Sequence, residues 1–141
     1  MSNLSSKSFS GLLIILGLLN IYLGLNVAFG GILTLGWQGQ TQFLNVTNEN
    51  AFLAQDSHIR FFGGLYVAVG LFLILAATNL RKYHMALFLI FFMTFIGGLA
   101  RFTMGRNDVV FGKAIIVSLT AELILMPVFF IWLFRLVRSN R

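Results

Sequence analysis

The stretch MALFLIFFMTFIGGLARFTMG, residues 85–105, decides the fold class of this chain. It is mostly apolar and carries a single charged residue, Arg101, close to its end. A membrane-spanning helix needs about 20 mainly apolar residues at a rise of about 1.5 Å each, and this stretch meets that length. It therefore predicts a transmembrane helix with a guanidinium group one turn beyond the pair Gly97 and Gly98.

The composition extends this prediction to the whole chain. Of its 141 residues, 58% are hydrophobic and 10% are charged, and the mean hydropathy is +0.89. Soluble domains usually carry about a quarter charged residues, so the chain is expected to lie in a bilayer as one domain, residues 1–141. The absence of cysteine excludes disulfides and thiolate chemistry.

Four segments are long and apolar enough to cross a membrane. They lie at about 9–35, 57–80, 84–104 and 112–137. The last two connections are short, so the helices that they join run antiparallel. We therefore expect an all-α, polytopic membrane protein, a four-transmembrane-helix antiparallel bundle with a longer outer loop after the first helix. Within that loop, Trp37 suits the headgroup level, and Asn48 is expected to cap a helix that runs into the second span.

The Lys and Arg residues are distributed unevenly between the two sides of this bundle. One side has six of the ten and no acid: Lys7, Arg81, Lys82, Arg135, Arg138 and Arg141. The other side has Arg60, Arg101, Arg106 and Lys113 together with Glu49, Asp56 and Asp108. The positive-inside rule then places both termini in the cytoplasm. The net charge of +6 is therefore explained by topology, and we expect no nucleic-acid partner.

Two mirrored motifs contain glycine pairs and arginines. The second span opens with Arg60-Phe61-Phe62-Gly63-Gly64, and the third ends with Gly97-Gly98-Leu99-Ala100-Arg101. Because the two spans run in opposite directions, the motifs are expected at the same depth. Glycine lets membrane helices approach closely, so we predict that Gly63, Gly64, Gly97 and Gly98 pack the second span against the third. A structural reading has the arginines merely reach up to the headgroups.

Glu122 is the one acidic residue predicted near the bilayer midplane, about 15 Å into the fourth span. A carboxylate there is costly and normally pairs inside the bundle. Its own helix face offers no base, so the partner must be Arg60 or Arg101 from another span. Pro127, one turn further on, frees the carbonyl of Leu123 and is expected to kink the helix.

These residues together predict a polar cluster in the outer half of the bundle. Its members are Arg60, Arg101 and Glu122, with Asp56, His58, Arg106 and Asp108 at its mouth and Asn20 from the first span. Near Asn20, Gly17, Gly24 and Gly31 recur at intervals of seven and form a small-residue seam for helix packing. The cluster is either an interhelical clamp or a pocket for an anionic headgroup or small amphiphile.

Catalytic and metal-binding patterns are weak. Asp56-Ser57-His58 supplies two ligands near a membrane surface, short of the three or four that a metal needs. Its structural interpretation is that Asp56 or Ser57 caps the second span while His58 faces water. We expect no metal, no cofactor and no enzymatic activity.

The ordered set of Asp56 to Gly64, Gly97 to Arg101 and a buried Glu122 resembles the domain-of-unknown-function family 4345 over nearly the whole chain. The resemblance implies a small four-helix protein of the bacterial inner membrane with no assigned activity. It supplies no reaction.

The sequence favours a non-enzymatic inner-membrane protein. Its Arg/Glu cluster is expected to bind a membrane lipid or small amphiphile, or to stabilise a homo-oligomer, in support of envelope integrity. The alternative is a small proton-coupled transporter or carrier with Glu122 as the titrating group. Against it, no whole-helix inverted repeat is visible.

Overall fold

The computed structural model describes residues 3–34 and 45–138, which form helices and turns and contain no strand. The longer elements are α1 (Asn3–Gly30), α2 (Glu49–Thr78), α3 (Leu80–Ala100) and α6 (Met126–Arg138). The shorter ones are η1 (Gly31–Leu33), η3 (Arg101–Met104), α4 (Asn107–Val110), α5 (Ile116–Thr120) and the π-helical turn η4 (Ala121–Leu125). Four segments could cross a membrane by length and apolarity, namely Leu4–Leu33, Glu49–Thr78, Leu80–Met104 and Ile116–Arg138. The chain is an all-α, multi-pass membrane protein, as predicted.

Two spans begin at residues other than those predicted. α2 begins at Glu49 and not near residue 57, because Asn48 caps it as expected, with the Ala51 amide donating to Asn48 Oδ1 at 3.1 Å. The fourth span begins at Ile116 and not at residue 112, since the chain first forms α4 and a further turn. Glu122 therefore lies about 9 Å from the start of its helix instead of about 15 Å.

The chain divides into two compact units. One consists of Gly11–Ala77, here called the α1–α2 unit. The other combines Met1–Ser10 with Thr78–Arg141 and is called the α3–α6 unit. Each is a pair of antiparallel spans, and the first turns of α1 belong to the second unit. The prediction that all four spans form one domain stays a prediction.

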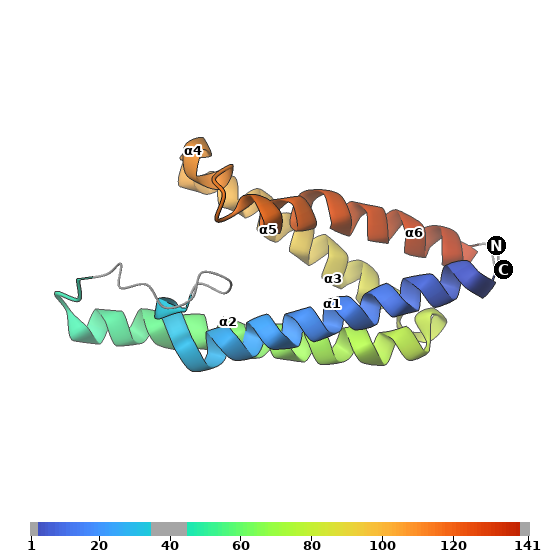
Figure 1. Ribbon diagram of the computed structural model, residues 1–141, viewed down its shortest axis with the longest axis horizontal. Coiled ribbons are helices and arrows are strands. Elements are labelled where there is room, and N and C mark those ends of the chain that lie inside the picture. Colours follow the sequence, from blue (N-terminus) through green and yellow to red (C-terminus); the bar gives the residue numbers. More distant parts are fainter. Residues whose placement is uncertain (1–2, 35–44, 139–141) are drawn as a thin grey trace. The chain divides into compact units, whose positions relative to one another are not determined.

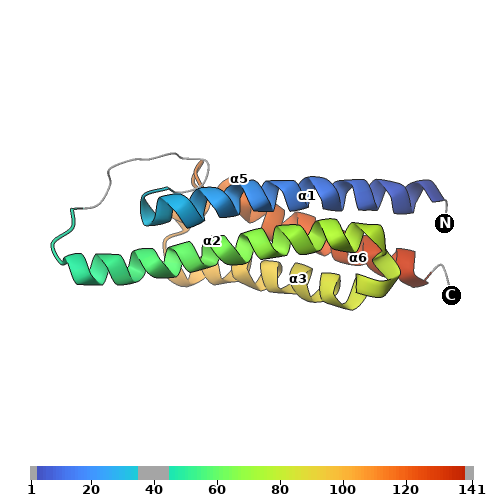
Figure 2. The ribbon, with the colours of Figure 1, turned by 90° about the horizontal axis from the view of Figure 1, so that it is seen from below.

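In the α1–α2 unit, two helices lie side by side through glycine (Figures 1 and 2). A Cβ added to Gly17 would lie 2.7 Å from the Gly70 carbonyl oxygen, and one added to Gly70 would lie 2.6 Å from that of Gly17. Gly24 and Gly63 are reciprocal in the same way, at 2.7 and 2.8 Å. The backbones are so close that no larger residue fits, which is the packing that small residues allow between membrane helices.

The glycine contacts repeat in register. Moving seven residues along α1, from Gly17 to Gly24, moves seven residues back along α2, from Gly70 to Gly63. One further step brings Gly31 opposite Asp56, where a Cβ on Gly31 would collide with the carboxylate. The glycine seam predicted in the first span is therefore present, and its partner is α2.

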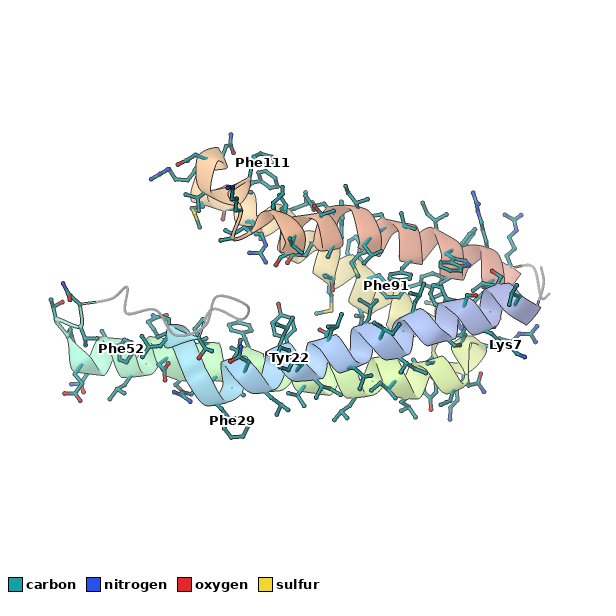
Figure 3. All side chains as sticks on the ribbon, viewed as in Figure 1. Lys7, Tyr22, Phe29, Phe52, Phe91 and Phe111 are labelled. Atoms are coloured by element: carbon teal, nitrogen blue, oxygen red, sulfur yellow. The ribbon has the colours of Figure 1, made fainter. Side chains whose placement is uncertain are left out.

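In the α3–α6 unit, aromatic rings fill the space between helices. Phe91 of α3 stacks on Phe129 of α6 with ring centroids 5.8 Å apart, and Figure 3 labels Phe91 between these helices. Phe9, from the first turns of α1, packs against Phe129 at 5.5 Å and Trp132 at 5.2 Å. Trp132 Nε1 also donates to Ser5 Oγ at 3.0 Å. The start of α1 and the end of α6 therefore lie at the same end of this unit.

The four glycines of the mirrored motifs differ in their surroundings. Gly63 contacts α1, and Gly98 contacts η4, so each makes its close approach within its own unit. At Gly64 and Gly97, an added Cβ would meet no atom of the described residues within 4 Å. The predicted packing of the second span on the third joins the two units and stays a prediction.

Candidate functional site

Arg101 and Glu122 form a two-pronged ion pair between α3 and the fourth span. Arg101 Nε donates to Glu122 Oε2 at 2.6 Å, and Nη2 donates to Oε1 at 2.6 Å. Both residues lie inside membrane-spanning segments, and their side chains are 35% and 14% exposed. Bidentate charge-assisted bonds of this kind are the strong class of hydrogen bond. The prediction that Glu122 pairs with an arginine of another span is confirmed, with Arg101 as the partner.

Gly98 makes room for this pair on the face of α3. A Cβ at Gly98 would lie 2.8 Å from Glu122 Cβ and 3.3 Å from Glu122 Oε2. The stem of the glutamate therefore lies against the bare backbone of α3, one turn before Arg101. Glu122 lies nearer the start of its helix than predicted, and the two side chains bond directly.

The helix is irregular where it carries Glu122. In the π-helical turn Ala121–Leu125, the Met126 amide donates to the Ala121 carbonyl, five residues back instead of four. Pro127 follows directly, and its missing N–H deprives Leu123 of its ordinary helical donor. The irregularity predicted from Pro127 thus includes a π-turn, a feature that occurs frequently at functional sites.

A second arginine–carboxylate pair closes the end of the glycine seam in the α1–α2 unit. Arg60 Nε donates to Asp56 Oδ2 at 2.6 Å within α2. Arg60 Nη1 also donates to the carbonyl oxygens of Ala28 at 3.1 Å and Phe29 at 2.7 Å. Asp56 Oδ1 accepts the Ile32 amide at 2.7 Å. Arg60 therefore caps the carbonyl end of α1, where unpaired acceptors and the negative end of the helix dipole attract a cation.

The predicted polar cluster is divided between the two units. Arg101, Glu122, Arg106 and Asp108 belong to the α3–α6 unit, and Asp56, His58, Arg60 and Asn20 belong to the α1–α2 unit. Of the two predicted partners of Glu122, Arg101 is the one that bonds to it, while Arg60 donates to Asp56 and to two carbonyl oxygens of α1. Asn20 donates Nδ2 to the Leu16 carbonyl of its own helix at 2.9 Å. His58 is exposed.

Arg106 and Asp108 form an exposed pair beyond the end of η3. Arg106 Nε donates to Asp108 Oδ1 at 2.9 Å, and Nη2 donates to Oδ2 at 2.6 Å. The Arg106 guanidinium holds the pKa of the Asp108 carboxyl below its ordinary value of 3.8. The same hydrogen bonds raise the pKa of Arg106. Both side chains are 64% exposed, so the pair marks the surface of the unit and not its interior.

Metal-binding geometry does not occur among residues 3–34 and 45–138. No three His, Asp or Glu side chains there lie close enough to hold an ion. Asp56 is engaged by Arg60 and the Ile32 amide. Asp56 also does not cap the start of α2, as one interpretation had it, because the helix already begins at Glu49.

Residues 8–133 match the family described as "Domain of unknown function (DUF4345)". The chain belongs to this family. The match includes both glycine–arginine motifs and Glu122, and the family description carries no activity. No curated protein and no solved structure matches the chain.

Sequence reasoning on this DUF4345 chain missed the acceptors of Arg60. The Ala28 and Phe29 oxygens are backbone atoms, so no side-chain pattern points to them. A signal was nevertheless available. Gly63 and Gly70 of the second span repeat the spacing of Gly17 and Gly24, and extending that register brings the end of the first helix to Asp56.

Proposed function

We propose that this DUF4345 protein is a non-enzymatic membrane protein that binds an anionic lipid or small amphiphile at the Arg101–Glu122 pair. One observation carries the proposal: a bidentate ion pair lies inside two membrane-spanning segments, at a π-helical turn. Ionisable residues at such positions are functional candidates by default, because hydrocarbon makes them costly.

The exposure of the pair supports a ligand. Glu122 is largely covered, whereas a third of the Arg101 side chain is exposed. A phosphate or carboxylate headgroup matches the planar guanidinium fork as Glu122 does. An amphiphile could therefore place its acid group beside Arg101 and its acyl chain along the apolar surface of α3.

Arg60 is a poorer candidate for this role. Its donors hold Asp56 and two carbonyl oxygens at the end of α1. A headgroup that took this guanidinium would uncap α1 and strand Asp56 at the glycine seam. We therefore assign Arg60 and Asp56 to the structural clamp and Arg101 and Glu122 to the ligand site.

The orientation follows from the distribution of charge. Six bases without an acid flank one side of the spans, so both termini are proposed to lie in the cytoplasm and the spans in the inner membrane. The Arg101–Glu122 pair then lies in the outer half of the bilayer. Compartment-sensitive reporters fused at Arg81 and at Gln42 test this, and a cytoplasmic signal at Gln42 contradicts it.

A proton-coupled carrier is the second candidate, and the π-turn before Pro127 favours it. Transporters often bind their substrates at interrupted helices near the middle of the membrane. Glu122 would be the titrating group. Proton uptake by liposomes that contain the protein, abolished in Glu122→Gln, would support this function over simple binding.

The binding proposal is tested by titrating the purified full chain with a single-chain alkyl phosphate. We expect Arg101→Met to abolish saturable binding and Glu122→Gln to tighten it, because the competing carboxylate is gone. Arg106→Met is the matched control and should bind like the wild type. Unchanged binding by Arg101→Met would contradict the proposal. In cells, Arg101→Met should lower envelope integrity, measured as sensitivity to detergent.

A further inference from the structure

Basic side chains gather at one end of the α3–α6 unit. They come from three separate parts of the chain: Lys7 from α1, Arg81 and Lys82 from the start of α3, and Arg135 and Arg138 from the end of α6. All five are exposed. We call this set the basic end of the unit. Figure 3 shows Lys7 here and Phe111 at the opposite end of the same unit.

Side-chain contacts hold these segments together. The Trp132 indole donates to Ser5, which joins the end of α6 to the turn of α1 that carries Lys7. Phe88 of α3 packs on Phe130 of α6 with centroids 4.6 Å apart, and His84 packs edge-on against Phe88 at 6.1 Å. The basic end is therefore built by tertiary contacts and is not a run of neighbouring charges.

The chain segments that carry these bases contain no Asp or Glu. The four acids of the chain are Glu49, Asp56, Asp108 and Glu122, and none lies in residues 3–10, 78–88 or 128–138. Helix stability does not explain all of the bases either. Arg135 and Arg138 suit the end of α6, but Arg81 and Lys82 lie in the first turn of α3, where the helix dipole disfavours cations.

We infer that the basic end binds the phosphates of anionic phospholipids in the adjacent leaflet. Clusters of four to eight bases beside membrane spans attract anionic headgroups. The surroundings favour a lipid over a nucleic acid or an acidic protein. Trp132 and Tyr83 lie beside the bases, and such residues belong at the headgroup level. This inference is independent of the ligand at Arg101.

The test uses energy transfer from Trp132 to a lipid label. The chain has two tryptophans, so Trp37→Phe is introduced throughout to leave Trp132 as the single donor. The full chain in nanodiscs of neutral phosphatidylcholine receives phosphatidylglycerol or phosphatidylcholine that carries a dansyl group on one acyl chain. We expect energy transfer to be several-fold greater with labelled phosphatidylglycerol and to fall as salt is raised.

Two matched double variants locate the effect. Lys82→Gln with Arg135→Gln removes two charges from the basic end, and Arg106→Gln with Lys113→Gln removes two from the opposite end of the unit. We expect the first to lose the headgroup preference and the second to keep it. Circular dichroism checks that both are folded. Lys82→Arg with Arg135→Lys keeps both charges and should retain the preference.

Three results would overturn the inference. Equal transfer from both labelled lipids in the parent protein means that the bases only set orientation during insertion. If both double variants lose the preference for phosphatidylglycerol equally, only the net charge of the protein matters and not the position of the bases. Displacement of the labelled lipid by inorganic phosphate or by an oligonucleotide, each at matched ionic strength, means that the surface takes a soluble anion.

Discussion

The two arginine–carboxylate pairs of this protein use the same chemistry for different contacts. Asp56 and Arg60 are four residues apart on α2. Arg60 also bonds to backbone atoms at the end of α1, and Asp56 to a backbone amide of η1, which follows it. Arg101 and Glu122 come from different spans and bind each other with both prongs of the guanidinium. The first pair completes a helix end. The second brings two opposite charges together inside spans, at a turn where the helix is irregular.

The glycines beside each pair show the same contrast. Gly63, three residues after Arg60, lies against the backbone of α1. Gly98, three residues before Arg101, lies against the Glu122 side chain. A backbone neighbour cannot yield, whereas a side chain can shift. We therefore regard the α1–α2 contact as rigid and the Arg101–Glu122 region as adaptable.

The largest expected effect comes from filling the glycine seam. Gly63→Leu should destabilise the protein by about 3 kcal/mol, at the upper end for overpacking, because even its Cβ would lie 2.8 Å from the Ala28 Cα. Gly64→Leu is the comparison variant, since a Cβ there meets no described atom within 4 Å and so does not fill the seam; we expect a smaller loss, which measures the predicted packing on the third span instead. Unfolding in mixed detergent measures both. Equal losses of unfolding free energy in the two variants would show that Gly63 is no more tightly packed than Gly64.

A double-mutant cycle on Arg101 and Glu122 should give the next largest effect. Breaking a fully buried pair costs about 3 to 5 kcal/mol, and we expect about 2 kcal/mol for Arg101→Met or Glu122→Gln because Arg101 is partly exposed. The combined variant should be near wild type in stability, since neither charge is then left unpaired. Additive losses in unfolding free energy would show that the pair is not coupled.

Arg60→Lys should have a smaller effect, confined to the clamp. Lysine keeps the charge but loses the fork that spans Asp56 and two carbonyl oxygens, so we expect a loss of about 1 kcal/mol. Amphiphile binding at Arg101 should be unchanged. Arg106→Lys serves as the control for an exposed arginine. If Arg60→Lys also lowers amphiphile binding, the two pairs act as one site.

The smallest effect concerns the exposed pair. Arg106 holds the pKa of Asp108 below 3.8. The stability that this pair adds to the folded protein is therefore present above pH 3.8 and is lost as the pH falls through the lowered pKa. In Arg106→Gln, the pKa of the Asp108 carboxyl should rise towards its ordinary value, because its largest lowering cause is gone. Carbon NMR of the Asp side chains measures the shift, and an unchanged midpoint would show that the pair does not persist in solution.

Much of the fold could be predicted from the sequence, because length and apolarity decide whether a segment spans a bilayer. The cap at Asn48, the seam of Gly17 and Gly24, and the need of Glu122 for a partner on another helix all follow from local chemistry. The predicted starts of the helices were less accurate than the number of spans. The short helix α4 and the turn after it displace the start of the fourth span from residue 112 to Ile116.

The candidate site could be predicted only in part. Depth in the membrane, counted along ideal helices, does not distinguish Arg60 from Arg101 as the partner of Glu122. The choice depends on backbone acceptors at the end of α1, which engage Arg60, and on the space that Gly98 leaves for the glutamate. Pro127 indicated a break in the helix, but its π-helical form depends on packing that a sequence pattern does not contain.

Native mass spectrometry of the full chain, released from its own membrane, tests the division between clamp and ligand site most directly. Wild type, Arg60→Lys and the combined Arg101→Met with Glu122→Gln variant are compared under the same conditions. Our account predicts one amphiphile, seen as a constant added mass, on wild type and on Arg60→Lys. It predicts that this mass is missing from the combined variant despite its retained stability, whereas phospholipid bound at the basic end is the same in all three. The same added mass on the combined variant, or its absence from the wild type, would contradict the account.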